Sequence, residues 1–212
     1  MATVNDIIEL AMDSVADSSF EDRCVGFLNQ GIQHIASLVR LPDLLVSDAA
    51  LIVPANTSQV NLPEDYWDHL YMVHDDSGRR VDVFRDSFFT FLRKFPKGKA
   101  GTSIIACAPV GRVLHTYYTC QTDKTLKLFY GRRPTVLEES DDVVEIPEPF
   151  ASTLLEAYVC MECFRRIEDG VEGRKTNTDH WNRTYLQGIA ELISFLGIDD
   201  AEPEYVADED WI

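Results

Sequence analysis

The chain has 212 residues, of which 36 are acidic and 19 basic, giving a formal net charge of −17 at pH 7. Because an acidic surface repels phosphate, these values exclude a general affinity for nucleic acid, although a local basic patch could still contact DNA. The 45% hydrophobic content and the length suit one globular domain carrying an inserted module. No apolar run approaches about 18 residues and the start does not resemble a secretory signal, so we expect no membrane association.

The two ends of the chain have the apolar periodicity of amphipathic helices. Four segments with a spacing of about 3.6 residues predict helices: residues 3–18, 20–40, 150–167 and 177–196. Thr3 or Asn5 can cap the first helix, and Gly197 stands where a C-cap follows the last one. Gly26 and Gly31, inside the second helix, indicate close packing against a neighbouring element.

The middle of the chain reads as short strands separated by turns. Strands are predicted at residues 51–53, 58–62, 69–73, 81–84, 103–108, 113–118 and 126–130. Between the fourth and fifth of these, a short helix that Asp86 or Ser87 can cap is predicted to end at Phe95. Phe88, Phe89 and Phe91 could stack on nucleic-acid bases, but their spacing favours burial by the helix itself.

These elements predict an α+β protein. We expect residues 1–42 and 146–197 to form two helical hairpins that pack as a four-helix core. Residues 43–145 form a β-rich insert, either a small sandwich or a twisted antiparallel sheet. Residues 198–212 form an acidic C-terminal tail with seven acids and no base.

Basic residues are concentrated in the predicted insert. Residues 79–133 contain twelve basic and three acidic residues, a formal charge of +9, so the remaining chain carries −26. Two surfaces of opposite sign allow copies of one chain to meet in a fixed orientation. The simplest alternative is a solvated charged surface, and contact with DNA is a third. The candidate subunit-interface residues are Arg79, Arg80, Arg93, Lys94, Lys97 and Lys99.

The acidic tail ends on large apolar side chains. An acidic run is usually a solvated, unstructured segment, and that interpretation stays open here. Tyr205, Trp211 and Ile212 are more typical of a linear segment that becomes ordered when it docks on a partner. We therefore take these three as candidate partner-binding residues.

No residue pattern indicates catalysis, a metal or a cofactor. Cys160 and Cys163 form a CxxC pair, but no second pair follows at zinc spacing and the motif lies within a predicted helix. We expect them to be buried structural thiols, and we expect all five cysteines to be reduced. The five histidines are dispersed, and no nucleophile, base and orienting group come together. We therefore expect no enzymatic activity.

The order of elements resembles the head–tail adaptor (neck, or connector-ring) proteins of tailed bacteriophages over about residues 3–197. The helical pairs at both ends contribute to the resemblance. So do four segments between them: residues 61–66 (NLPEDY), 76–78 (DSG), 128–134 (LFYGRRP) and 146–150 (IPEPF).

The resemblance implies a structural virion protein without covalent chemistry or cofactors. Such proteins form a ring, usually of about twelve copies, beneath the portal of the DNA-filled capsid. They extend the DNA channel and present a platform for the next tail component. The implied partners are other copies of the chain, the portal protein and a tail, stopper or nozzle protein, while DNA passes through without specific binding. The implied location is the virion neck, after assembly in the host cytoplasm.

Under this interpretation Tyr205, Trp211 and Ile212 contact the portal or the tail. A different class of function stays possible from the residues alone. It is an intracellular dimeric binding or regulatory module whose basic β region recruits an acidic partner. A dimer and a ring differ in mass, so oligomer size separates the two interpretations.

Overall fold

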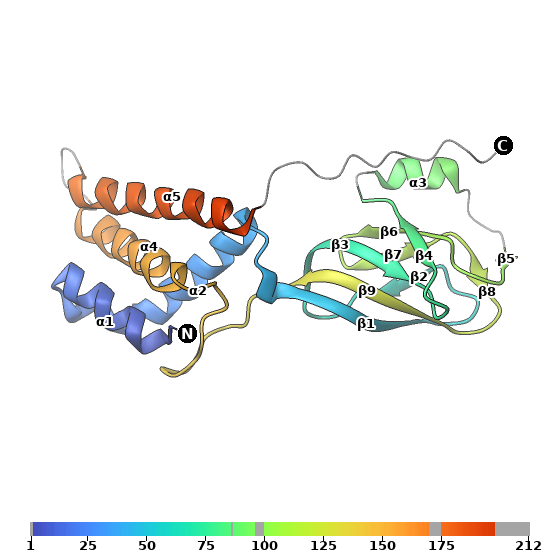
Figure 1. Ribbon diagram of the computed structural model, residues 1–212, viewed down its shortest axis with the longest axis horizontal. Helices are drawn as coiled ribbons and strands as arrows, with labels where there is room; N and C mark the ends of the chain where they lie inside the picture. The colour runs from blue at the N-terminus through green and yellow to red at the C-terminus, as the bar shows by residue number, and fades with distance from the viewer. Residues whose placement is uncertain (1, 86, 96–99, 170–174, 198–212) are drawn as a thin grey trace. The chain divides into compact units, whose positions relative to one another are not determined.

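A computed structural model describes residues 2–85, 87–95, 100–169 and 175–197 of the chain (Figure 1). The chain divides into two compact units, which we call the helical unit, Met1–Leu41 with Pro134–Ile212, and the β unit, Pro42–Arg133. The predicted α+β class is confirmed. Residues 134–145, which the sequence analysis placed in the insert, group with the helical unit.

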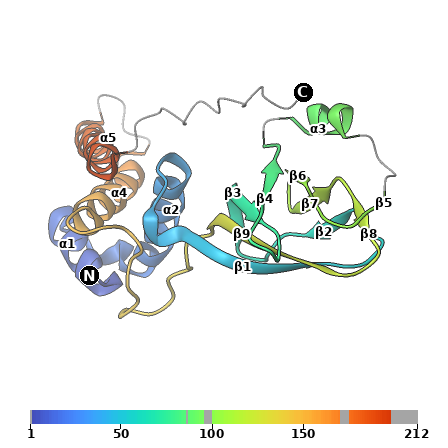
Figure 2. The ribbon, with the colours of Figure 1, turned by 45° about the vertical axis from the view of Figure 1, so that its right-hand side comes forward.

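The helical unit is built around one central helix. Its helices are α1 (Val4–Val15), η1 (Ser18–Phe20), α2 (Glu21–Leu38), α4 (Phe150–Ile167) and α5 (Thr176–Leu196). Helix α4 contacts α1, α2 and α5, and Figures 1 and 2 show it between α1 and α5. The predicted helices therefore form close to the expected positions, while a four-helix core made from two hairpins stays a prediction.

Local sequence signals fix the helix ends. The Thr3 hydroxyl accepts from the Asp6 N–H at 3.3 Å, while the Asp6 carboxylate accepts from the Thr3 N–H at 3.0 Å. This capping box confirms Thr3 as the N-cap of α1. Gly197 confirms the predicted C-cap of α5, with a φ of 61° that glycine adopts without steric cost.

Of the two glycines in α2, only Gly31 marks a close approach. A Cβ atom at Gly31 would lie 2.9 Å from Cδ1 of Tyr158 on α4, so the absence of a side chain lets the two helices approach. A Cβ atom at Gly26 would have nothing within 4 Å, so the predicted close packing there is wrong.

Residues 134–145 pack along the helical unit through main-chain hydrogen bonds. The Val4 N–H donates to the Asp142 carbonyl at 3.1 Å, just where α1 begins. The Asn29 side chain on α2 donates to the Leu137 carbonyl at 2.9 Å and accepts from its N–H at 2.8 Å. These bonds explain why the acidic link belongs with the helices rather than with the strands.

The β unit contains a curled open sheet of seven strands in the order β1-β9-β3-β4-β6-β7-β2, with a separate β5-β8 pair. Its elements are η2 (Pro42–Leu44), β1 (Leu45–Val53), β2 (Gln59–Asn61), β3 (Tyr66–His74), β4 (Arg80–Val83), α3 (Phe88–Lys94), β5 (Ala100–Gly101), β6 (Ala106–Val110), β7 (Val113–Thr116), β8 (Thr119–Cys120) and β9 (Lys124–Arg132). The sandwich alternative is therefore wrong.

One pairing within the large sheet departs from the predicted antiparallel arrangement. Strands β4 and β6 pair in parallel, with Asp82 opposite Ala106 and Val83 opposite Cys107. Parallel neighbours need a crossover connection, and the segment that contains α3 supplies it. The predicted short helix is thus the crossover of this β–α–β connection.

The curl of the sheet encloses one hydrophobic core. Leu126 and Leu128 of β9 are fully buried, whereas Lys127 between them is exposed, as expected for a strand with one buried face. They share a cluster with buried residues of β1, β3, β4, β6 and β7. The strand register shifts within β1 and within β3, and Asp48 and His69, which lie at these shifts, have positive φ. Such irregularities are typical of β-bulges, which bend strands.

Candidate interaction surfaces

We call residues 79–133 the basic block. Some of its arginines stabilise the β unit through hydrogen bonds within that unit. Three guanidinium groups donate hydrogen bonds to main-chain carbonyls of loops and strands in the same unit. The pairs are Arg85 with Leu70 at 2.8 Å, Arg112 with Glu64 at 2.7 Å and Arg132 with Asp43 at 3.2 Å. Because charged donors bond to main-chain carbonyls within the unit, these arginines contribute to its stability.

Arg79 and Arg80 are exposed where β4 begins. The preceding turn is held by Asp75, whose carboxylate accepts from the Ser77 hydroxyl at 2.6 Å and the Arg79 N–H at 2.8 Å. The hydrogen bond from the Ser77 side chain is the largest of the effects that lower the pKa of Asp75. The turn therefore fixes the main chain at the start of β4, from which these two arginine side chains project.

Arg93 and Lys94 are exposed on the last turn of α3. The Lys94 ammonium lies 5.4 Å from the centre of the Phe84 ring, within the range of a cation–π contact. Lys97 and Lys99 lie outside the described part of the chain. The two pairs of described candidates are thus on different elements, and their role at a subunit interface stays a prediction.

The formal charge of each unit depends on where the boundary between the two units lies. Residues 42–78 contain seven acids and no base, and they belong to the same unit as residues 79–133. The β unit therefore has twelve basic and ten acidic residues, a formal charge of +2. The helical unit has seven basic and 26 acidic residues, a formal charge of −19. Most of the charge asymmetry comes from the acidic helical unit.

Phe89 is exposed to solvent, although the aromatic spacing predicted that the helix buries it. It is 82% exposed, whereas Phe91 is buried against Ala106 and Ala108 of β6. A seven-residue helix lying on a sheet can bury only one of its faces, and Phe89 falls on the other. The aromatic spacing predicted the helix correctly, but it could not say which ring faces the sheet.

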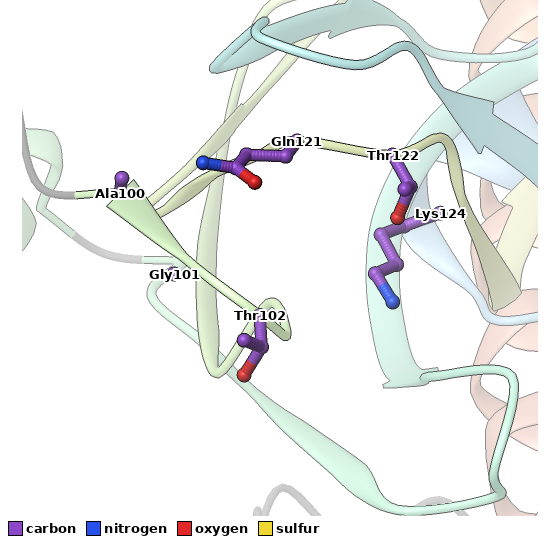
Figure 3. A pocket seen from close by; sticks show the side chains of 6 residues that line it. All are labelled: Ala100, Gly101, Thr102, Gln121, Thr122 and Lys124. Carbon is purple, nitrogen blue, oxygen red and sulfur yellow. The ribbon is translucent and has the colours of Figure 1, made fainter.

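A shallow cavity lies beside the β5-β8 pair. It has a volume of about 410 Å³ and is lined by Ala100, Gly101, Thr102, Gln121, Thr122 and Lys124 (Figure 3). Lys124 is the one charged residue among these six. The side chains of Thr102, Gln121, Thr122 and Lys124 are neutral or cationic and can hydrogen-bond, so they offer contact to a polar or acidic side chain.

The CxxC cysteines are buried, as predicted. Cys160 and Cys163 lie on the inner side of α4, and a side-chain hydrogen bond joins Cys163 to Cys24. Burial raises the pKa of Cys160 to about 12, and the hydrogen bond with Cys24 is the main cause that raises the pKa of Cys163. These two thiols are protonated at neutral pH. Among the residues that the structure describes, no group of three or more His, Cys, Asp or Glu side chains could hold a metal ion.

Comparison with protein families identifies the class of protein. A family model described as SU10 adaptor protein matches residues 2–206. The chain belongs to the SU10 adaptor protein family. This is a family of phage head–tail adaptors, so the resemblance inferred from the element order is confirmed. A comparison with curated proteins finds no match.

Family membership sets the general role of the molecule. An SU10 adaptor protein is a structural component of the phage neck, where it contacts other virion proteins. No helix in the described ranges is long and apolar enough to cross a membrane. Of the tail candidates, Tyr205 lies within the matched residues and Trp211 and Ile212 follow them; all three fall beyond the residues whose structure is described.

Proposed function

We propose that this SU10 adaptor protein forms a homo-oligomeric ring, of about twelve copies, that docks beneath the portal and joins the capsid to the tail. The observation that carries the proposal is the family match over residues 2–206, because it includes both the helical unit and the β unit.

The charge distribution supports a ring. Head-to-tail contacts between identical chains require two different, complementary surfaces on each copy. The helical unit carries −19, while exposed cations lie on the β unit at Arg79, Arg80, Arg93 and Lys94. Electrostatic attraction between unlike surfaces speeds encounter and fixes orientation, and we propose that these residues face acidic surfaces of a neighbouring copy.

The C-terminal tail is the proposed link to the portal. Tyr205, Trp211 and Ile212 give an otherwise acidic segment three large apolar groups. Such a segment suits a groove on a partner, with the apolar side chains as anchors. Repetition around the ring would then multiply a modest affinity per copy.

The ring would surround DNA without holding it. With a net charge of −17, of which the helical unit carries −19 and the β unit +2, the protein as a whole repels the phosphate backbone. An acidic channel wall therefore allows DNA to pass without being retained, which an adaptor between capsid and tail requires. The remaining proposed partner is the tail, stopper or nozzle protein on the far side.

The deciding experiment is a mass measurement by light scattering combined with negative-stain imaging, at low and moderate salt. It is done with the purified chain alone and with the purified portal. Rings of about twelve copies, alone or on the portal, are the expected result. A discrete dimer whose mass is the same at low and moderate salt, and which does not bind the portal, would overturn the proposal.

A further inference from the structure

Helix α3 presents one large aromatic residue to solvent. Phe89 is 82% exposed, whereas the next most exposed large hydrophobic residues of the described chain, Ile52 and Phe195, each reach 60%. Arg93 follows Phe89 by one helical turn and lies on the same face. An aromatic ring together with arginine is the composition found at the centres of protein interfaces.

This face is rigid because rings on the other side of α3 fix the helix. The Phe88 ring lies 4.6 Å from the His115 ring, and the Phe95 ring lies 4.6 Å from the Tyr117 ring, both measured between centroids. The Ser87 hydroxyl accepts from the Thr90 N–H at 3.1 Å and caps the first turn. An anchor on a fixed element loses little conformational entropy when a partner covers it.

Helix α1 presents a surface of complementary character. Asp6, Glu9, Leu10 and Asp13 follow one another at spacings of three, one and three residues, and all are exposed on one face. Leu10 is 44% exposed beside the three carboxylates. Helix α1 contains no basic residue, and it belongs to the unit that carries −19.

We propose that the α3 face of one copy (Phe89, Arg93) docks on the α1 face (Asp6, Glu9, Leu10, Asp13) of a neighbouring copy. The inference rests on the ring proposed above and names one of its contacts. Phe89 packs on Leu10, while the Arg93 guanidinium faces the neighbouring carboxylates of α1. Because two different surfaces meet, the contact is heterologous, and its repetition closes a ring when the rotation between copies returns the last copy to the first.

The match in both charge and apolar content favours a second copy over another protein. Each face combines one exposed apolar residue with charge of one sign, Arg93 beside Phe89 on α3 and three carboxylates near Leu10 on α1, and the signs are opposite. Attraction between the faces is accompanied by repulsion between two α3 faces or two α1 faces, so only head-to-tail contact is favourable.

Cysteine pairing tests the contact whether or not a ring forms. A Phe89→Cys chain and a Leu10→Cys chain are mixed under air with a copper catalyst, and covalent dimers are counted. The native cysteines are buried, so the introduced thiols react preferentially. The matched control mixes Phe89→Cys with Leu186→Cys, since Leu186 is 53% exposed on α5. We expect covalent dimer well above the level of this control.

The outcomes separate the contact from the proposed ring. Rings of the wild-type chain without cross-linking above the control would overturn the contact and leave the ring. Cross-linking without rings, alone or on the portal, would support the contact and overturn the ring. Cross-linking of Phe89→Cys to the portal or to a tail protein instead would assign the α3 face to that partner and overturn the inference.

Charge reversal gives a second, independent test. Arg93→Glu and Asp13→Lys should each weaken association of the chains, by on the order of tenfold, because each places like charges together. The double variant should recover much of the loss, since it restores unlike charges. Arg23→Glu and Glu191→Lys, exposed residues on α2 and α5, are the matched controls. A double variant no better than either single one would contradict the proposed pairing.

Discussion

The helical unit and the β unit use charged residues in different ways. In the β unit, arginines donate to main-chain carbonyls, Lys127 lies 3.8 Å from Asp48, and the Arg133 guanidinium lies 5.2 Å from the centre of the Trp67 ring. Its charges are nearly balanced, at +2. Much of its basic content is thus used within the unit.

The helical unit has the opposite character. Its formal charge is −19, and acids line exposed helix faces and the link of residues 134–145. Arg165 and Glu162 lie 3.3 Å apart on α4 and form an ion pair within this unit. The long-range electrostatic field of this adaptor therefore comes mainly from the helical unit, whereas the exposed cations of the β unit act locally.

The largest expected effect concerns the separate cores of the two units. Leu155 on α4 and Leu128 on β9 are both fully buried. Replacing either by alanine removes contacts and leaves a cavity, so each variant should lose about 2–5 kcal/mol of unfolding free energy. Chemical denaturation followed by circular dichroism measures the loss. If the units unfold independently, Leu155→Ala should shift mainly the helical signal; equal shifts of one single transition would show that the units unfold together.

The next largest effect concerns the acidic C-terminal tail of the helical unit. Removing residues 199–212 deletes seven acids and the Trp211 and Ile212 side chains. Binding to the portal should weaken by roughly 2–3 kcal/mol per copy, because the burial of a tryptophan is lost. Titration of the portal measures this, and Trp211→Ala alone should reproduce most of it. A truncated chain that binds as tightly as the whole one would exclude the tail from portal binding.

A smaller effect separates basic residues that fold the β unit from those that face outward. Arg85→Met should lower the unfolding free energy by about 1.5–3 kcal/mol, because main-chain carbonyls lose a charged donor. Arg93→Met removes the same charge from an exposed position on α3 and should change stability by less than about 0.5 kcal/mol. Chemical denaturation of the pair provides the test, and equal losses would contradict the division of roles.

The smallest effect concerns the N-terminus of α1. Thr3→Ala removes the side chain that caps the helix and should cost about 1 kcal/mol in thermal or chemical unfolding. Ser37→Ala, near the C-terminal end of α2, should change stability less because its hydroxyl donates to a carbonyl of the same helix, that of His34. A loss of equal size in both variants would argue against the capping box as the cause.

The same cap has a predictable pH dependence. Hydrogen bonds from the Thr3 side chain and main chain lower the pKa of Asp6. A carboxyl with a lowered pKa stabilises the folded state above its ordinary pKa and loses that contribution as the pH falls through the lowered value. The stability difference between the wild-type chain and Thr3→Ala should therefore shrink in strong acid, and a difference that grows there would contradict the assignment.

Much of the local structure could be predicted because its causes are local. Apolar spacing located the four long helices, Thr3 and Gly197 marked two of their ends, and alternation located the main strands. The order of those elements also carried the resemblance to head–tail adaptors that the family match confirmed.

The errors concern contacts between segments far apart in the chain. The parallel β4-β6 pair and the curl of the sheet depend on how the strands assemble. The exposure of Phe89 depends on which face of α3 meets β6, and the lack of neighbours at Gly26 depends on where other helices lie. None of these is encoded by the spacing of nearby residues.

The secondary structure, the acidic character and the adaptor family followed from the sequence, because periodicity, composition and element order are properties of the chain. The packed fold decided the charge of each unit, since it groups the five acids of residues 134–145 with the helices instead of with the strands. It also decided which arginines bond to the main chain and which aromatic ring faces solvent. Burial and pairing are set by segments distant in the chain, so they follow only from the packed fold.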